Sequence, residues 1–523
     1  MKRRDFIRNA GLVGLAAPIT YNGYSINPIA QNSFFTKLAE NAVLSDKIMV
    51  FIELSGGNDG LNTLIPVDQY SKLALHRSSI LIPEDKVLAM SGVSGTGLHP
   101  AMTEVREMFD NGLVSVVQRV GYPNQDYSHF RSMDIWMTGA NSNQYLDSGW
   151  LGRTLEQDNP MYPTGYPNAD NPDPLAVQIG SVAPVSLMGS AFPMGVSVGN
   201  PDEIYDLIND YVEPAPATPY GDELTYIRTV MQKTKLYSEV IKDAATAGQN
   251  FSSQYPPEYE NELADQLKVI ARLINGGLTT QVYLVSIGGF DTHSEQTVDG
   301  NPESGTHAQL LRQVSQAIGA FQNDIELMGK ADKVCGMTYS EFGRTIAAND
   351  SIGTDHGAAA PLFVFGKGVK PGIIGSNPVI PTDVNISSDV DMQNDFRSVY
   401  ASVLQDWFGL ANPSDILYQQ FPILPIFKDT VPVKDTAGRD PFGFNNYPNP
   451  VRSSTTITFT IPSGMVTITL LDSQGRAIRK IAEGTYPAGT HKIMFDRQDL
   501  SSGTYYYQLR LNGIGITRKM LVI

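Results

Sequence analysis

The stretch Ile48–Leu54 (IMVFIEL) is apolar almost throughout and runs directly into the sequence SGGNDG at 55–60. A strand that is apolar on both faces is typical of the centre of a parallel sheet, and a Gly-rich turn is typical of its carboxyl end. The same pattern of an apolar run and a polar or Gly-rich ending recurs four times, at Leu113–Val120, Gln281–Ile287, Lys333–Tyr339 and Pro361–Phe365. We therefore expect a sheet built around several buried strands.

Segments with helical periodicity lie between or after these strands, at residues 102–110, 226–244, 260–274, 307–328 and 396–407. Strands that alternate with helices predict an α/β domain with a mainly parallel central sheet flanked by helices. Residues 158–219 are rich in Pro, Gly and Asn and are interpreted as an insertion of loops and short strands. In such sheets the polar residues that carry chemistry gather beyond the carboxyl ends of the strands.

The composition changes after residue 430, which indicates a second domain. Residues 431–446 form a polar linker rich in Gly, Pro and Asn. From Thr455 onward, short segments alternate apolar and polar residues and are separated by turns, a pattern that predicts an antiparallel β-sandwich. We expect the α/β domain to span 44–430 and the sandwich to span 447–523.

Charge and cysteine content limit the possible functions. The formal net charge is −16 and there is no dense cluster of Lys and Arg beyond the first residues, so we expect no nucleic-acid partner. The lone Cys335 rules out an intrachain disulfide. No segment is apolar over the ~20 residues that a transmembrane helix needs.

The N-terminus reads as an export signal. Arg3-Arg4-Asp5-Phe6-Ile7 precedes a short apolar run from Ala10 to Ile19. A basic start followed by such a run predicts a signal peptide at 1–30. The paired arginines favour the twin-arginine type, with a signal of the general pathway as the alternative.

Candidate site residues follow the predicted strands. Asp59 follows the first strand, Asp291 and His293 follow Gln281–Ile287, and Glu341 and Arg344 follow Lys333–Tyr339. Ser128 and His129 open a predicted helix, and Asp355 and His356 precede Pro361–Phe365. Carboxylates and imidazoles from separate elements of one sheet predict a metal site. The alternatives are a plain turn at Asp59, a helix cap at Ser128 and histidines that bridge backbone groups.

The C-terminal segment carries five short motifs in a fixed order: Tyr447-Pro448-Asn449-Pro450, Leu471-Asp472-Ser473-Gln474-Gly475, Ala488-Gly489-Thr490-His491, Leu500-Ser501-Ser502-Gly503-Thr504-Tyr505-Tyr506 and Lys519-Met520-Leu521-Val522-Ile523. They resemble the type A sorting domain of the type IX secretion system of Bacteroidota. The resemblance implies that the type IX machinery is a partner. It also implies that the chain passes through the periplasm to the cell surface or the medium.

The larger domain resembles the family of domain of unknown function 1501. The resemblance rests on six motifs: Glu53-Leu54-Ser55-Gly56-Gly57-Asn58-Asp59-Gly60, Ser128-His129-Phe130, Gly149-Trp150-Leu151-Gly152-Arg153, Phe290-Asp291-Thr292-His293, Ser340-Glu341-Phe342-Gly343-Arg344-Thr345 and Gly353-Thr354-Asp355-His356-Gly357. It implies an alkaline-phosphatase-like or sulfatase-like fold. It also implies hydrolysis of phosphate or sulfate esters, in a small anionic ester or in a sulfated or phosphorylated polymer.

The resemblance also implies metal ligands. Asp291, His293 and His356 match the residues that hold a first divalent metal, which we expect to be zinc, with calcium or magnesium as alternatives. A second metal would be held by Asp59, Ser128 and an Asp-His pair, but the chain has Glu341-Phe342 in place of that pair. His129 and Asp355 are the candidates to replace the missing histidine. The sequence therefore leaves open whether the site holds one metal or two.

The expected catalytic residues are Ser128, His129 and Arg344. Ser128 would attack the ester or position a water molecule, and Arg344 or Arg131 would bind the anionic oxygens. A non-catalytic surface protein with the same fold is the alternative from another class. An exported oxidoreductase is disfavoured because no Gly-x-Gly-x-x-Gly motif or cysteine cluster is present.

Overall fold

The computed structural model describes residues 19–21, 24–26, 46–159, 162–163, 166–168, 171–180, 184–190, 192–199, 236–428, 444–461, 464–472, 477–487, 489–498, 500–511 and 514–522. The predicted signal peptide lies outside this part of the chain except for two short strands, β1 (Ile19–Tyr21) and β2 (Tyr24–Ile26). Of the predicted linker, only residues 444–446 are described.

The described residues fall into two compact units. The larger contains residues 46–428, and the smaller contains the residues from 444 onward together with β1 and β2. Among all described residues, none of the helices combines the length and the apolar composition that a bilayer crossing requires.

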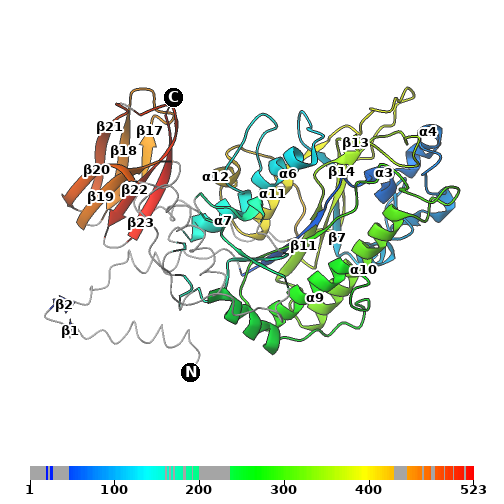
Figure 1. Ribbon diagram of the computed structural model, residues 1–523, viewed down its shortest axis with the longest axis horizontal. Helices are drawn as coiled ribbons and strands as arrows, with labels where there is room; N and C mark the ends of the chain where they lie inside the picture. The colour runs from blue at the N-terminus through cyan, green and yellow to red at the C-terminus, as the bar shows by residue number, and fades with distance from the viewer. Residues whose placement is uncertain are drawn as a thin grey trace. The chain divides into compact units, whose positions relative to one another are not determined.

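The larger unit is built on a nine-stranded sheet (Figure 1). The main path runs β15-β7-β14-β11-β3-β10-β8-β9, and β16 pairs with β7. The strands are β3 (Ile48–Leu54), β7 (Val114–Gly121), β8 (Ala176–Ile179), β9 (Val196–Val198), β10 (Val282–Ile287), β11 (Val334–Tyr339), β14 (Ala360–Phe365), β15 (Gly372–Ile374) and β16 (Asn394–Asp395). All pairings in this sheet are parallel except the two made by β14.

Strand β3 lies in the middle of the sheet because both of its faces are apolar. Ile48, Val50, Ile52 and Leu54 pack into one core, and Met49 and Phe51 pack into the core on the other face. Successive side chains of a strand point to opposite faces, so a near-continuous apolar run needs cover on both sides. The predicted α/β fold class with a mainly parallel sheet is confirmed.

Helices cover both faces of the sheet (Figure 1). On one face lie α5 (Thr103–Asp110), α9 (Glu262–Asn275) and α10 (Thr306–Leu327), and residues 236–247 are also helical. On the other face lie α6 (His129–Thr138), α7 (Trp150–Asp158), α11 (Phe396–Ser402) and α12 (Ser414–Leu417). Residues from these two sets of helices contribute to the two separate cores.

The region interpreted as an insertion extends the sheet. Strands β8 and β9 lie within residues 158–219 and pair in parallel, and β8 continues the sheet from β10. Their brevity explains why their pattern is weak in the sequence. These strands therefore form one edge of the central sheet and not a separate subdomain.

The smaller unit consists of two antiparallel sheets around one core. The sheets have the strand orders β17-β18-β21 and β20-β19-β22-β23. The strands are β17 (Asn445–Tyr447), β18 (Ser454–Ile461), β19 (Gly464–Leu471), β20 (Ala477–Tyr486), β21 (Gly489–Asp496), β22 (Gly503–Leu511) and β23 (Ile514–Val522). Ile457 and Phe459 from the first sheet share a core with Ile468 and Leu509 from the second. The predicted antiparallel strands are confirmed.

Candidate metal centre

The predicted site residues meet at one edge of the central sheet because of the direction of a single strand. Strands β3, β7, β10 and β11 all end at this edge, whereas β14 is antiparallel to both of its neighbours, β7 and β11. The start of β14 therefore lies beside the ends of the others. This brings His356, which precedes β14, next to residues that follow β7 and β10.

The turn after β3 allows the segments to approach closely. Gly56 has a φ of +123°, and a Cβ atom there would lie 2.3 Å from the backbone nitrogen of Asp291. Only glycine adopts this backbone conformation without strain, and no side chain fits in this space. The Gly-rich turn in the sequence is thus a condition for placing Asp291 at the site.

Four side chains converge at this edge: His129, Asp291, His293 and His356. The Nε2 atoms of His293 and His356 lie 2.9 Å apart. Asp291 Oδ1 lies 3.2 Å from Nε2 of His293 and 3.3 Å from Nε2 of His356. Asp291 Oδ2 lies 3.5 Å from Nε2 of His129. Three imidazole nitrogens and one carboxylate thus face one another.

Each of the three imidazoles is oriented through its other nitrogen. The Nδ1 atoms contact oxygen acceptors: Glu341 Oε1 at 2.8 Å for His129, Asp355 Oδ1 at 3.0 Å for His293, and the backbone oxygen of Tyr127 at 2.7 Å for His356. A neutral ring that donates its Nδ1 proton to such an oxygen turns its Nε2 lone pair toward the centre. Nε2 lone pairs beside the Asp291 carboxylate are an arrangement that a bound cation stabilises.

The donor atoms of His129, Asp291 and His356 all lie within 4.8 Å of one another, a spacing that could hold a metal ion. A tetrahedral ion with ligands at about 2.0–2.1 Å places its donor atoms about 3.3 Å apart. The closest separations here range from 2.9 Å to 3.5 Å. Imidazole nitrogen suits zinc and other transition metals, whereas calcium and magnesium prefer all-oxygen sites. The set also resembles metal sites in which carboxylates and carbonyls hold the ligand histidines.

The protonation states of two ligands suit a cation. Burial lowers the pKa of His356, which keeps the imidazole neutral. Burial by itself raises the pKa of Asp291, but the hydrogen bond and the charge of Arg344 outweigh this effect and hold that pKa below its ordinary value. A neutral imidazole and an ionised carboxylate are the forms that coordinate metals.

Glu341 and Asp355, which we expected to bind a metal directly, lie behind histidines. Glu341 is buried, and its Oε1 accepts from the Gly56 amide at 2.8 Å as well as contacting His129. Asp355 accepts from Asn349 Nδ2 at 3.2 Å in addition to contacting His293. Asn349 also donates to the backbone oxygen of His293 at 2.9 Å and was not singled out in the sequence, because nothing marks a loop asparagine as a partner.

Asp59 and Ser128 contact other groups than the four ligands. Asp59 is fully buried, forms an ion pair with Arg77 and accepts from Gln296 Nε2 at 2.5 Å. Ser128 is the exposed N-cap residue of α6, and its hydroxyl makes no capping hydrogen bond. It immediately precedes His129 in the chain.

Arg344 and Arg131 are both engaged inside the protein. Arg344 is fully buried and donates to four backbone oxygens, those of residues 56, 57, 290 and 354, and to Asp291 Oδ1 at 2.7 Å. Arg131 pairs with Asp134 and donates to three backbone oxygens of residues 141–144. Arg344 therefore orients Asp291, and neither guanidinium is free to bind a substrate.

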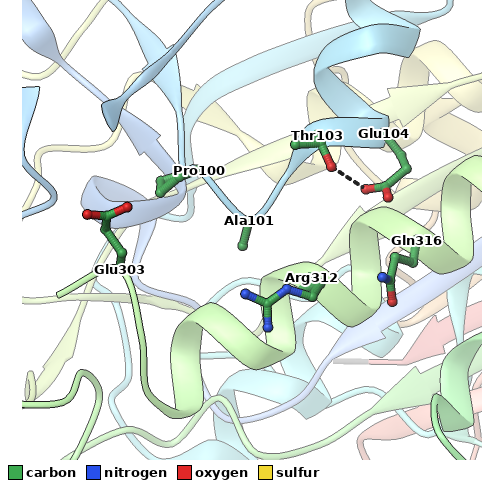
Figure 2. A pocket seen from close by; sticks show the side chains of 7 residues that line it. All are labelled: Pro100, Ala101, Thr103, Glu104, Glu303, Arg312 and Gln316. Atoms are coloured by element: carbon green, nitrogen blue, oxygen red, sulfur yellow. Dashed lines mark hydrogen bonds between the residues drawn. The ribbon is translucent and has the colours of Figure 1, made fainter. Parts of the chain in front are cut away.

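A separate cavity of about 310 Å³ lies between α5 and α10 (Figure 2). Arg312 and Gln316 line it from α10, and Thr103 and Glu104 lie across from them at the start of α5 (Figure 2). None of its lining residues belongs to the group of His129, Asp291, His293 and His356. This cavity is thus distinct from the candidate metal centre.

Family models match two segments of the chain. Residues 214–420 match the family described as protein of unknown function (DUF1501). The segment includes Asp291, His293 and His356, whereas Asp59 and His129 precede it. Residues 445–523 match the secretion system C-terminal sorting domain, of the type IX system, which indicates secretion or attachment at the cell surface.

Several solved structures resemble the chain at low sequence identity. One, from work on the metabolism of multiple glycosaminoglycans by Bacteroides thetaiotaomicron, is 10% identical over 86% of this chain and 90% of that chain, with a TM-score of 0.35. Another is a protein in the alkaline phosphatase superfamily from Vibrio parahaemolyticus, 10% identical over 82% of this chain and 78% of that chain, with a TM-score of 0.32. The PsFucS1 sulfatase from Pseudoalteromonas sp. is 10% identical over 90% and 89%, with a TM-score of 0.28. No curated protein is similar enough to match the chain.

Proposed function

We propose that the chain is an exported, metal-dependent hydrolase that cleaves phosphate or sulfate esters. The observation that carries this proposal is the convergence of the Nε2 atoms of His129, His293 and His356 on the Asp291 carboxylate. A divalent ion bound there supplies a Lewis acid for an ester oxygen and lowers the pKa of a bound water molecule. We favour zinc because three of the four donors are imidazole nitrogens.

The protein's own residues would prepare the centre before substrate arrives. Glu341, Asp355 and the Tyr127 carbonyl hold the three imidazoles in one orientation. Arg344 fixes one oxygen of Asp291. A site held by such contacts loses little free energy to reorganisation when it binds a ligand.

Substrate can reach the centre from solvent. The side chains of Asp291 and His293 are 47% and 45% exposed, and the neighbouring Ser128 is exposed as well. The Ser128 hydroxyl is at the N-terminus of α6, where the helix dipole favours negative charge. We assign it the role of nucleophile or of a group that positions the attacking water.

Metal content and ester hydrolysis, measured together on the full chain, test this function. We expect bound zinc by elemental analysis, turnover of aryl sulfate or aryl phosphate esters, loss of turnover with a chelator and recovery on addition of zinc. The variant His293→Ala should lose both metal and turnover. His491→Ala, which removes a histidine of the smaller unit, serves as the matched control and should retain both.

A non-catalytic surface protein is the second candidate. The observation that favours it is that Arg344 and Arg131, the expected anchors for anionic oxygens, are both engaged internally. Stoichiometric metal without turnover of any ester in the panel would support this candidate and contradict the hydrolase.

A further inference from the structure

Asp59 is a buried carboxylate whose known contacts are all internal. It has no exposed surface, its Oδ1 accepts from the Leu61 amide at 3.2 Å, and its Oδ2 contacts Gln296 and Arg77. Burial raises the pKa of this carboxyl, but the charge of Arg77, with His307 and Gln296, more than offsets that effect and lowers the pKa below its ordinary value. Asp59 is therefore an ionised group that needs a cation beside it.

Arg77 supplies that cation, although the burial of its guanidinium is itself unfavourable. It follows α4 (Tyr70–His76) and is fully buried. Among the described residues, its Nε and Nη1 atoms have no hydrogen-bond partner. A buried guanidinium with two unmet donors is unfavourable unless a strong ion pair compensates. The pair with Asp59 is thus the interaction that holds Arg77 in this place.

Other residues around the centre are likewise committed elsewhere. Both Oε1 contacts of Glu341 are internal, to Gly56 and His129. Phe342 is buried, and its ring lies 4.9 Å from the ring of His129 and 4.6 Å from that of His356. An aromatic ring therefore packs against two of the ligand imidazoles. While Arg77 pairs with Asp59, the residues present do not fit a second metal ion.

We infer that the centre holds a single metal ion and that the Arg77 guanidinium acts as a built-in cation on Asp59, in the place of a second ion. The inference rests on the metal centre of the proposed function.

The number of bound ions tests the inference without reference to activity. The full chain, saturated with zinc and dialysed, should contain one zinc per chain by elemental analysis. Two equivalents, or none, would overturn the inference. Because this count needs no turnover, it decides the inference even if no ester is hydrolysed and the proposed function fails.

The variant Arg77→Met tests the role of the guanidinium. Without Arg77, the buried Asp59 carboxylate lacks a cation, and the Nδ1 atom of His307 nearby is buried without a partner. We expect this variant to take up a second zinc equivalent. Arg119→Met, which removes an arginine near the surface, should stay at one. A folded Arg77→Met that also stays at one would overturn the role of Arg77.

A double variant completes the test. The double variant Arg77→Met/Asp59→Asn removes both charges, so it should fold and bind one zinc even if Arg77→Met does not fold. Two equivalents in the double variant would contradict the role of Asp59.

Discussion

Glu341 illustrates how much a single residue behind a ligand contributes. Its buried carboxylate contacts His129 Nδ1 and accepts from the Gly56 amide, so it links a ligand to the turn after β3. A carboxylate on a ligand histidine fixes the tautomer and raises the basicity of the coordinating nitrogen. We therefore regard Glu341 as a positioning residue.

The substitution Glu341→Ala should weaken zinc binding by about 10- to 100-fold, the usual effect of losing such a partner. Glu341→Gln keeps an acceptor oxygen and should lose less. Competition with a chromophoric chelator measures both affinities, and Glu258→Ala, which removes an exposed glutamate elsewhere, is the control. Equal affinities for Glu341→Ala and the wild-type chain would show that His129 does not depend on this contact.

At the scale of elements, the turn between β3 and α3 (Gly60–Thr63) and the direction of β14 build the site. The turn follows the end of β3 with a backbone conformation that glycine alone adopts easily. The antiparallel β14 places His356 beside Asp291. The apolar strands were recognisable in the sequence because burial on both faces leaves a local pattern. The direction of β14 was not, because it depends on pairing with β7 and β11.

Alanine substitutions at two glycines test whether close packing of this turn matters for stability. Gly56→Ala adds a methyl group 2.3 Å from the Asp291 nitrogen at a φ of +123°, so it should lower the free energy of unfolding by about 3 kcal/mol or more. Gly92 has a φ of +75° but no atom within 4 Å of an added Cβ, and Gly92→Ala should cost about 1 kcal/mol. Urea unfolding measures both. If the two costs were the same, close packing of the turn on Asp291 would not matter.

At the scale of the whole larger unit, buried histidines couple stability to pH. Burial lowers the pKa of His99 to about 3 and of His307 to about 4, from an ordinary value of 6.5. At pH values below 6.5 but above these two lowered pKa values, each histidine is mostly protonated in the unfolded chain and mostly neutral in the folded chain. Their contribution to stability therefore falls as the pH falls, by about 2 kcal/mol for each histidine between pH 7 and pH 5. Glu53, whose pKa burial raises to about 7, acts in the opposite direction by about 2 kcal/mol.

Substitution of one histidine isolates this effect. Between pH 7 and pH 5, the wild-type chain should lose about 2 kcal/mol more of its unfolding free energy than His99→Gln loses. Urea unfolding with a chelator present excludes any contribution from metal release. His491→Gln, in the smaller unit, should show the wild-type dependence. An unchanged pH dependence in His99→Gln would contradict a neutral, buried His99.

The sequence by itself determined the class of fold, the strands at the middle of the sheet and the sandwich at the C-terminus. These features follow from patterns of burial within single segments, which neighbouring residues reveal. It also placed the chemically active residue types at strand ends. Short strands were expected within residues 158–219, but the bounds of β8 and β9 were not, because three or four residues carry too little periodicity.

Only the tertiary structure decided which of those residues face the centre and which stand behind. His129 and Glu341 are 212 positions apart, and Arg77 and Asp59, which are 18 positions apart, form their ion pair only in the folded chain. A carboxylate that binds an ion and one that orients a histidine have the same chemistry in the sequence. Their roles differ because of distances of a few ångströms, and those distances are set by the order and direction of the strands.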